Sequence, residues 1–448
     1  MTPALEGRTR GKVVMLVGKE ITHDARVHRE AASLAAHGYE VAIACRSAND
    51  EPSTVEDCEG YRILAGPIPS EAERARDVRR ALRAVRSERL ELSSEVDGEA
   101  RSRRVQSRLA ELEHAEAKLS ERREILAQKG PPDLEKRFRR AWAEMLREST
   151  PEVIHVHDHP GLATALKVRG SATAVVYDAH EHLLGKDLNP GRRPFLESYL
   201  RRCAPLADAV VTVGSAIAEQ LERELKLPAT PIVVHNTPSL RDAKSAPYDL
   251  RAAIGIDSAT SLLVYTGSLT RRRRLDTVIR ALVGLPDVHL AAVLLEEPSG
   301  PAALADELGV AGRVHFPPPV PHDTLVSLVR DADIGIHPLD RYGNGDVALP
   351  NKLFEYLHAD LPMVVSHSPQ MAAFVREHGL GEIAPADDPD AWRRGIVRVL
   401  ANRDAYRGEP AARERLRRQW SWEAQEDVLL SLYKRLTEGK TRPDRPER

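Results

Sequence analysis

Residues 264–282, VYTGSLTRRRRLDTVIRAL, contain the pattern from which the fold class of this protein can be predicted. This stretch continues an apolar β-branched run, LLVYTG, that ends at Gly267, and a segment with helical periodicity begins near Leu275. Four consecutive arginines stand between the two. The same order of apolar run and helical segment recurs along the chain, which is typical of parallel sheets built from strand-helix-strand units. The sequence therefore predicts an α/β protein.

Two series of such runs predict two domains. The chain has 448 residues, more than one hydrophobic core usually spans. A polar stretch, TPSLRDAKSAPYD, separates the two series, so we expect a first domain over 1–240 and a second over 241–419. The predicted strands span 13–18, 41–46, 61–66, 153–158, 174–180, 209–214 and 231–236 in the first series, and 262–267, 289–295, 314–316, 334–339 and 363–367 in the second.

Residues 70–148 break this alternation. They are rich in Arg, Glu, Ala and Leu, and two arms of apolar residues at heptad spacing meet at Asp97-Gly98. This pattern predicts an antiparallel helical hairpin inserted into the first domain. It is either a solvated structural insertion or an arm that binds an acceptor, a partner protein or a second copy of the chain. The apolar positions are Leu82, Val85, Leu92 and Val96 in the first arm, and Val105, Leu109, Leu112, Leu119 and Leu126 in the second.

Charge and cysteine content argue against several classes of protein. The chain has 65 basic and 67 acidic residues, a formal net charge of -2, so we expect no nucleic-acid partner. Its three cysteines lie far apart, which argues against a disulfide framework or a zinc site and favours the cytoplasm. The N-terminus lacks the apolar core of a secretory signal, and no run approaches the ~20 apolar residues of a spanning helix. Peripheral membrane contact stays open because of arginines at 192, 193, 201 and 202.

Two segments of the first domain could carry chemistry. The first strand ends at Gly18 without a Gly-x-Gly-x-x-Gly, which argues against a nicotinamide oxidoreductase. Asp24 could cap the helix that follows, and a helix N-terminus at this edge can hold an anion. His180 and Glu181 follow the fifth strand, at the edge where open parallel sheets bind ligands.

Two groups of residues have the side chains of metal ligands, yet we expect no metal. His155, His157 and His159 alternate along a strand, and ordinary packing explains them as well as a metal-binding face does. Asp331 and Asp333 form an Asp-x-Asp, but they precede a strand, whereas open sheets bind ligands at the carboxyl ends of strands.

The second domain offers a site for phosphate. Arg271 to Arg274 stand beside the exposed N-H groups of a helix start, which predicts a diphosphate site, the alternative being a solvated basic turn. In LPNKLFEYL (349–357), Asn351 and Lys352 lie beside the unpaired N-H groups of a second helix, and Glu355 faces inward one turn later. Lys352 could therefore bind a phosphate and Glu355 the hydroxyls of a ribose.

Taken together, these segments resemble the family-4 glycosyltransferases, retaining enzymes of the GT-B architecture. The likeness covers nearly the whole chain outside the hairpin. The resemblance implies two Rossmann-like domains whose parallel sheets face a cleft, a terminal helix over 420–438 that crosses back to the first domain, and a polar tail over 439–448. It rests on HDARVHREAASLAAHGYEV (23–41), VVYDAHE (175–181), ADAVVTVGSAIAEQL (207–221), VYTGSLTRRRRLDTVIRAL (264–282), NKLFEYLHADLPMVVS (351–366) and WSWEAQEDVLLSLY (420–433).

The resemblance also implies roles for single residues. His180, with Glu181 beside it, matches the family histidine near the donor sugar. Arg273 matches the basic residue that grips the diphosphate, and Glu355 matches the second glutamate of the family's Glu-seven residues-Glu motif, expected on the ribose. The implied set for donor and diphosphate is Gly18, Gly267, Ser268, Arg273, Asn351 and Lys352, and the set for the nucleoside is Phe316 and Glu355.

Three positions depart from the family pattern. Val347 stands where the first motif glutamate is expected, with Asp346 beside it. Ser268 replaces an arginine, and Arg274 replaces a glycine. These changes concern the contacts to the sugar hydroxyls and the grip on the phosphates.

The implied activity is hexosyl transfer from a nucleoside diphosphate sugar with retention of configuration. In the family the acceptor attacks from the front face, and the departing phosphate helps to take its proton. Arg273 and Lys352 would neutralise that phosphate, so we predict a metal-independent enzyme without a cofactor. The acceptor is a small molecule, a glycan or a lipid-linked molecule. Two alternatives stay open. One is a nucleotide-sugar epimerase. The other is a non-catalytic glycosyltransferase-like partner protein, which is suggested by the departures from the family pattern at Val347 and Ser268.

Overall fold

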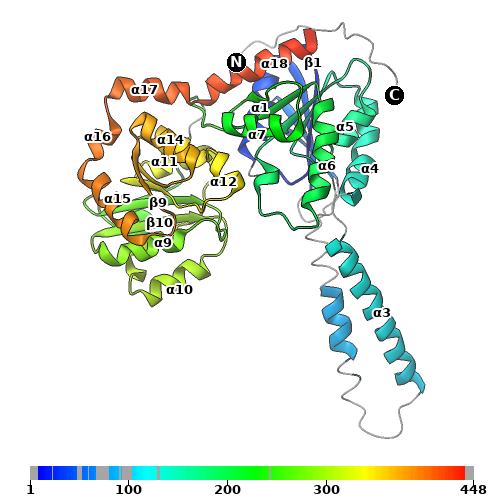
Figure 1. The fold of residues 1–448 in the computed structure, drawn as a ribbon, viewed down its shortest axis with the longest axis horizontal. Coiled ribbons are helices and arrows are strands. Elements are labelled where there is room, and N and C mark those ends of the chain that lie inside the picture. Colours follow the sequence, from blue (N-terminus) through cyan, green and yellow to red (C-terminus); the bar gives the residue numbers. More distant parts are fainter. Residues whose placement is uncertain are drawn as a thin grey trace.

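The computed structural model of the chain has two α/β lobes, shown in Figure 1. It describes residues 9–22, 24–47, 53–58, 60–66, 80–89, 92, 103–128, 132–241 and 244–438. The first lobe contains one sheet and the helices packed on it, including the last helix of the chain, and the second lobe contains the other sheet. The predicted tail over 439–448 lies outside the described residues.

The first lobe is built on an eight-stranded sheet in the order β3-β4-β2-β1-β5-β6-β7-β8. Every pair is parallel except β3 with β4. Strand β3 was not predicted, because TVEDC is exposed at four of its five positions and pairs only at the edge of the sheet. The strands are β1 (Gly11–Val17), β2 (Tyr39–Arg46), β3 (Thr54–Cys58), β4 (Tyr61–Gly66), β5 (Val153–His157), β6 (Ala174–Ala179), β7 (Ala209–Thr212) and β8 (Ile232–Val233).

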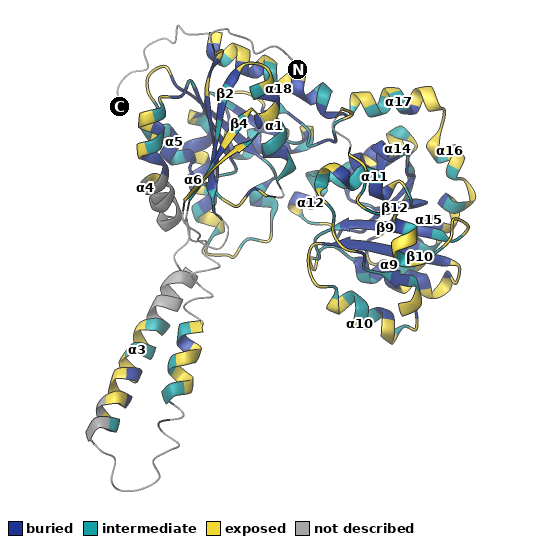
Figure 2. Cartoon of the chain, turned by 180° about the vertical axis from the view of Figure 1, so that it is seen from behind, coloured by how far each residue is buried: buried dark blue, intermediate teal, exposed yellow. Residues whose placement is uncertain are grey.

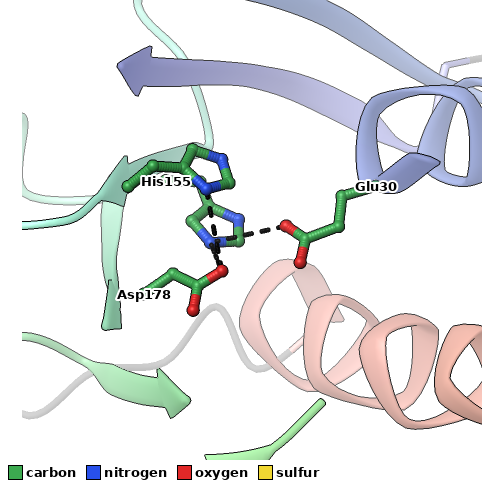
Figure 3. A group of neighbouring side chains, drawn as sticks. Glu30, His155 and Asp178 are labelled. Atoms are coloured by element: carbon green, nitrogen blue, oxygen red, sulfur yellow. Dashed lines mark ion pairs between the residues drawn. The ribbon is translucent and has the colours of Figure 1, made fainter. Parts of the chain in front are cut away.

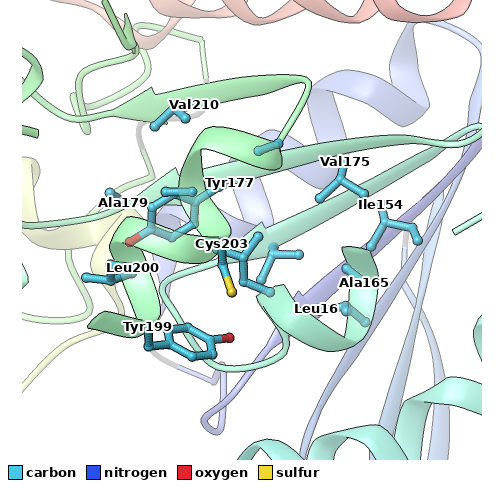
Figure 4. Close-up of a cluster of buried hydrophobic side chains, with 14 of the residues drawn as sticks. Leu16, Ile154, Ala165, Val175, Tyr177, Ala179, Tyr199, Leu200, Cys203 and Val210 are labelled. Atoms are coloured by element: carbon cyan, nitrogen blue, oxygen red, sulfur yellow. The ribbon is translucent and has the colours of Figure 1, made fainter. Parts of the chain in front are cut away.

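Alternate side chains of these strands enter two separate cores. Leu16, Ile154 and Tyr177 point into one core, part of which Figure 4 shows, while Met15 and Val176 point into the other. Because both faces are covered, the strands are apolar almost throughout. The helical segments are α1 (Ala25–Ala36), α4 (Pro132–Ser149), α5 (Leu162–Val168), η2 (Leu183–Gly185), α6 (Arg193–Cys203), η3 (Ala204–Leu206) and α7 (Ser215–Leu225).

The last helix, α18 (Trp422–Glu438), belongs to the first lobe although it follows the second in sequence. Leu429, Leu432 and Tyr433 are buried in the same core as Met15. The indole nitrogen of Trp422 donates a hydrogen bond to Ser33 Oγ at 2.9 Å. The chain therefore passes between the lobes twice.

The second lobe has a six-stranded sheet in the order β11-β10-β9-β12-β13-β14, in which all pairs are parallel. Figure 2 shows its strands as a buried layer between helices. The strands are β9 (Ser261–Gly267), β10 (Val288–Leu294), β11 (Val314–His315), β12 (Ile334–His337), β13 (Met363–Ser366) and β14 (Gly381–Ala384). The helical segments are α8 (Leu250–Ile254), α9 (Leu275–Ala281), η4 (Leu282–Gly284), α10 (Ser299–Glu307), η5 (Ala311–Arg313), η6 (His322–Thr324), α11 (Leu325–Val329), α12 (Gly343–Val347), α13 (Asn351–His358), α14 (Pro369–His378), α15 (Pro389–Ala401), α16 (Arg403–Arg407) and α17 (Pro410–Gln419).

Residues 80–89 and α3 (Arg103–Gln128) are two helical segments that run antiparallel to each other. Arg86 pairs with Glu116 at 2.7 Å, and Glu88 pairs with Arg108 at 2.7 Å. Of the predicted heptad positions, Leu82, Leu109 and Leu112 are buried, and Val85, Leu92, Val105 and Leu119 are half-buried. The turn at 97–98, Val96 and the side chain of Leu126 lie outside the described residues. Figure 1 shows α3 projecting from the first lobe.

The helices of the described ranges include none that combines the length and the apolar composition needed to cross a membrane.

Candidate functional site

A buried ion-pair network joins the start of α1 to the end of β6. The Arg26 guanidinium, 1% exposed, contacts Asp178 Oδ2 at 2.8 Å and Glu30 Oε1 at 3.0 Å. Asp24 caps the helix by accepting a hydrogen bond from the Val27 N-H. Burial by itself would raise the pKa of the Asp178 carboxyl, but the Arg26 charge, the His180 charge and hydrogen bonds from His155 and His180 together hold this pKa well below its usual range. Arg26, in the first turn of α1, therefore holds the end of β6 in place, and His180 directly follows that strand.

Four residues with metal-ligand side chains meet in this network. Atoms of Glu30, His155, His157 and Asp178 all lie within 4.8 Å of one another, and Figure 3 shows this buried group with Glu30, His155 and Asp178 labelled. Arg26 already supplies a full positive charge to both carboxylates. His155 Nδ1 also lies 2.7 Å from the Tyr433 hydroxyl, which ties the network to α18. We therefore interpret the group as an ion-pair network around a guanidinium.

His180 lies at the edge of this network, directly after β6. Its Nε2 is 2.9 Å from His157 Nδ1 and 3.5 Å from Asp178 Oδ2, and its Nδ1 is 4.0 Å from Asp158 Oδ2. Burial alone favours the neutral ring, but the two carboxylates raise the pKa of His180 to about 9. Burial and the neighbouring imidazoles hold the pKa of His157 well below its usual value. His180 is therefore the protonated ring of the pair, and it donates to His157.

Gly18 and Glu181 line a cavity of about 270 Å³ beside His180. Glu181 Oε1 pairs with Lys186 Nζ at 2.7 Å, and Lys19 pairs with Asp24 at 2.8 Å. The ammonium groups of Lys19 and Lys186 are thus both paired, and both residues belong to the wall of the cavity. The lining also includes His157, Asp158, His159, Leu188 and Arg192.

The second lobe places two cations around Gly267, where β9 ends. A Cβ at Gly267, whose φ is +107°, would lie 2.7 Å from Lys352 Nζ. Lys352 Nζ also lies 5.5 Å from the centre of the Tyr265 ring. Burial and the nearby Arg273 guanidinium lower the pKa of Lys352 to about 7. Arg273 Nη1 is buried and has no hydrogen-bond partner among the described residues, so it can take a ligand.

The other predicted residues of this set occupy the same loops. Ser268 accepts a hydrogen bond from the Tyr265 hydroxyl through its carbonyl oxygen, at 2.8 Å, so its own side chain is not used in that contact. Asn351 is the first residue of α13, and Pro350 precedes it as the cap.

Sequence reasoning missed His337, a fully buried ring at the end of β12 whose two nitrogens lack partners within the described ranges. The signal available in the sequence was the position of this histidine at the end of the apolar run IGIH.

Glu355 lies beside a second cavity, of about 780 Å³, which takes residues from both lobes. Its Oε1 is 3.3 Å from His322 Nε2, while its Oε2 is buried and lacks a partner in the part of the chain that the structure describes. Burial alone would raise the pKa of Glu355, but His322, Lys352 and Arg29 hold it below the usual value. The cavity wall includes Thr22, His28, Arg29, Pro238, Leu295, Pro321 and His322.

Phe316, predicted on the nucleoside, packs against the core of the second lobe and is not among the residues that line this cavity. His322 was missed, although it follows the proline-rich run FPPPVP directly after β11.

Val347, which departs from the family pattern, and its neighbour Asp346 both contact other parts of the protein. Val347 packs against the core of the first lobe, and Asp346 pairs with Arg341 at 2.9 Å. Both aspartates of the Asp-x-Asp have partners within the protein. Asp331 accepts from the Leu250 N-H, and Asp333 accepts from the Leu262 N-H and pairs with Arg251.

Comparison with known proteins identifies two matching family models. Residues 95–237 match the model described as "Glycosyl transferase 4-like domain", and residues 249–423 match "Glycosyl transferases group 1". Together they cover more than half of the chain.

Curated relatives match over a shorter range. The D-inositol 3-phosphate glycosyltransferase of Mycolicibacterium gilvum is 32% identical over 193 residues, which are 41% of this chain and 42% of that protein. The enzyme of the same name from Mycobacterium bovis is 30% identical over 193 residues, 41% of this chain and 39% of that protein. The chain thus matches less than half of the length of these relatives.

Solved structures match over almost the full length. Sucrose-phosphate synthase from Thermosynechococcus elongatus gives a TM-score of 0.68 at 17% identity, covering 96% of this chain and 100% of that one. Anabaena HepE in complex with UDP gives 0.58 at 12% identity, covering 94% and 98%. The E. coli trehalose-6-phosphate protein bound with UDP-2-fluoro glucose gives 0.62 at 13% identity, covering 94% and 99%. These matches confirm the GT-B fold. The chain belongs to the group 1 glycosyltransferases, and residues 95–237 match a glycosyl transferase 4-like domain.

Proposed function

We propose that this protein transfers a hexosyl group from a nucleoside diphosphate sugar to a polar acceptor, with retention and without a resident metal ion. One observation carries the proposal. Lys352 and Arg273 bring two half-buried cations to the end of β9, where Gly267 leaves room and one guanidinium nitrogen, Arg273 Nη1, is buried and lacks a partner among the described residues. A diphosphate supplies the negative charge that this arrangement lacks.

The nucleoside half of the donor fits the larger cavity. Glu355 Oε2, buried and unpartnered among the described residues, is a hydrogen-bond acceptor suited to a ribose hydroxyl. Uridine is the first base to test, since the solved neighbours from Anabaena and E. coli contain UDP and UDP-2-fluoro glucose.

In the proposed reaction the bond between the sugar C1 and the terminal phosphate oxygen breaks. The acceptor hydroxyl oxygen forms the new bond to C1 on the same face, and its proton passes to the departing phosphate. Arg273 and Lys352 stabilise the charge that grows on that phosphate, the role a divalent ion has in other transferases. Protonated His180 would stand at the sugar as a hydrogen-bond donor.

The acceptor would enter through the cavity of about 270 Å³ at Gly18 and Glu181. Its wall carries three cations, Lys19, Lys186 and Arg192, together with the carboxylates of Asp158 and Glu181, so we expect a polar acceptor there. D-inositol 3-phosphate, the acceptor in the name of the curated relatives, is the first to test.

The test is a panel of nucleotide sugars with and without acceptors, in buffer with EDTA and again with Mg²⁺. Release of nucleoside diphosphate that depends on an acceptor, proceeds in EDTA and yields a product with the donor's anomeric configuration supports the proposal. An inverted anomer refutes retention, and loss of activity in EDTA that Mg²⁺ restores refutes metal independence. An isomerised nucleotide sugar formed without acceptor supports the epimerase. Nucleotide binding without transfer or hydrolysis for any donor supports the non-catalytic protein.

A further inference from the structure

The loop that follows His180 is in direct contact with the second lobe. The backbone N-H of His182, two residues after His180, donates a hydrogen bond to Asn344 Oδ1 at 2.8 Å. Asn344 belongs to α12 and is only 7% exposed. Helix α12 lies on the side of the second lobe that faces the first (Figure 2).

Two glycines allow the lobes to approach this closely. A Cβ at Gly185 would lie 2.6 Å from the Asn344 nitrogen, and a Cβ at Gly343 would lie 2.8 Å from the Gly185 oxygen. Both distances are shorter than a real Cβ contact, and the atoms met are backbone atoms that cannot turn away. Backbone therefore packs on backbone across the boundary between the lobes.

An ion pair extends the same contact to the phosphate loop. Arg272 Nε and Nη2 reach the two oxygens of Asp187 at 2.7 and 2.8 Å. The same guanidinium covers the Tyr342 ring at 5.3 Å, just before α12. Asp187 is 61% exposed, so the pair contributes little to stability, but its bidentate geometry fixes an orientation.

We propose that Asn344 and Arg272 are positioning residues, which clasp the lobes so that the His180 loop stands at a fixed place relative to the Arg273 loop. The clasp consists of His182, Gly185 and Asp187 on the first lobe, and of Arg272, Gly343 and Asn344 on the second. His182 follows Glu181 directly, and Arg272 precedes Arg273. On each lobe, the clasp residues are thus covalent neighbours of a residue that is proposed to contact the substrates.

The clasp matters because transfer between two substrates on different lobes depends on their mutual distance. A misplacement of about 1 Å can cost on the order of a hundredfold in rate. In the proposed function, on which this inference rests, the groups that hold UDP are Arg273, Lys352 and Glu355, all on the second lobe, although the nucleoside cavity also takes residues from the first lobe. Loss of the clasp should therefore reduce transfer while UDP binding persists.

The buried half of the clasp is tested with Asn344→Ala and Asn344→Asp. The aspartate keeps an oxygen that accepts from the His182 N-H, whereas the alanine does not. We expect Asn344→Ala to lower kcat with UDP-glucose by at least about tenfold, with UDP affinity within about twofold. Asn344→Asp should restore most of kcat. Equal losses in the two variants, or a loss of UDP affinity that matches the loss of kcat, would overturn the proposal.

The exposed half is tested with Asp187→Arg, Arg272→Asp and the double exchange, which leave the core intact. Each single variant should lower kcat and increase the radius of gyration measured by small-angle X-ray scattering with UDP bound, and the double exchange should reverse both effects. Arg398→Asp, which breaks an exposed ion pair inside the second lobe, is the matched control and should change neither. Unchanged scattering and kcat in both single variants refute the clasp. If the wild type transfers no sugar from any donor, the proposed function is wrong. The radius of gyration of the variants with UDP bound still tests whether the clasp holds the lobes together.

Discussion

Lys352 Nζ occupies the space into which a side chain at Gly267 would project, because a Cβ built there lies 2.7 Å from that nitrogen. The lysine comes from the start of α13 and the glycine from the end of β9, 85 positions earlier in the chain. The close approach places a cation directly over the loop that leaves β9. A positive φ of +107° at Gly267 turns that loop, and residues with a Cβ rarely adopt this conformation.

Gly267→Ala should therefore displace the Lys352 ammonium and weaken UDP binding by about tenfold, as for the loss of one charge-assisted hydrogen bond. Isothermal titration calorimetry checks this. The same substitution in a Lys352→Ala background should have a smaller effect, since the displaced group is already absent. Equal effects in both backgrounds would assign the loss to backbone strain alone.

UDP binding should be linked to proton uptake at Lys352. Its pKa of about 7 in the free protein means that the amine is largely neutral above that pH, while a diphosphate favours the ammonium form. UDP affinity should thus fall by up to about tenfold per pH unit from pH 7 to 9, and the binding enthalpy should depend on the ionisation enthalpy of the buffer. Lys352→Met should bind more weakly and lose both dependences. A slope retained in that variant would point to another group.

Glu355→Gln should weaken UDP binding without affecting the binding of inorganic pyrophosphate, because the proposed contact of Glu355 is to the ribose. The 2′-deoxy and 3′-deoxy forms of UDP identify the hydroxyl. The wild type should bind one of them about tenfold more weakly than UDP, and Glu355→Gln should not distinguish that analogue from UDP. If the variant still discriminates fully, Glu355 does not hold a ribose hydroxyl.

His180 should make the stability of the fold depend on pH. Its pKa of about 9 exceeds the ordinary value of 6.5, so its contribution is fully present below pH 6.5 and is lost as the pH rises through 9. A shift of that size corresponds to about 3 kcal/mol. The difference in unfolding free energy between the wild type and His180→Gln, measured with urea, should therefore shrink from pH 6 to pH 10. A constant difference would exclude the protonated ring.

Arg26→Met should destabilise the protein strongly, since it leaves the carboxylates of Glu30 and Asp178 buried without their cation. Breaking a buried pair in this way costs about 3–5 kcal/mol. Denaturant unfolding at pH 7 measures the loss. Arg418→Ala, which removes the exposed partner of Glu414, is the control and should change stability little. A comparably small effect of Arg26→Met would mean that the two carboxylates are protonated in the fold.

Local patterns predicted most of the architecture because they depend on near neighbours in the chain. The runs before Gly18 and Gly267 are strands, and α9 begins at Leu275 as expected. Strand β14 was missed, because GEIA is mostly half-buried and short. It pairs closely with Met363, whose carbonyl oxygen would lie 1.8 Å from a Cβ at Gly381.

Apolar periodicity, helix caps and glycine positions act over a few residues, so local patterns in the chain predict two mainly parallel sheets, the loops that leave them and the kinds of charge on those loops. The partners of those charges are set by long-range packing instead. Asp178 meets Arg26, 152 positions away, and His182 meets Asn344, 162 positions away. Such contacts depend on how sheets, helices and lobes pack, and no short pattern in the chain records the distance between two of its loops.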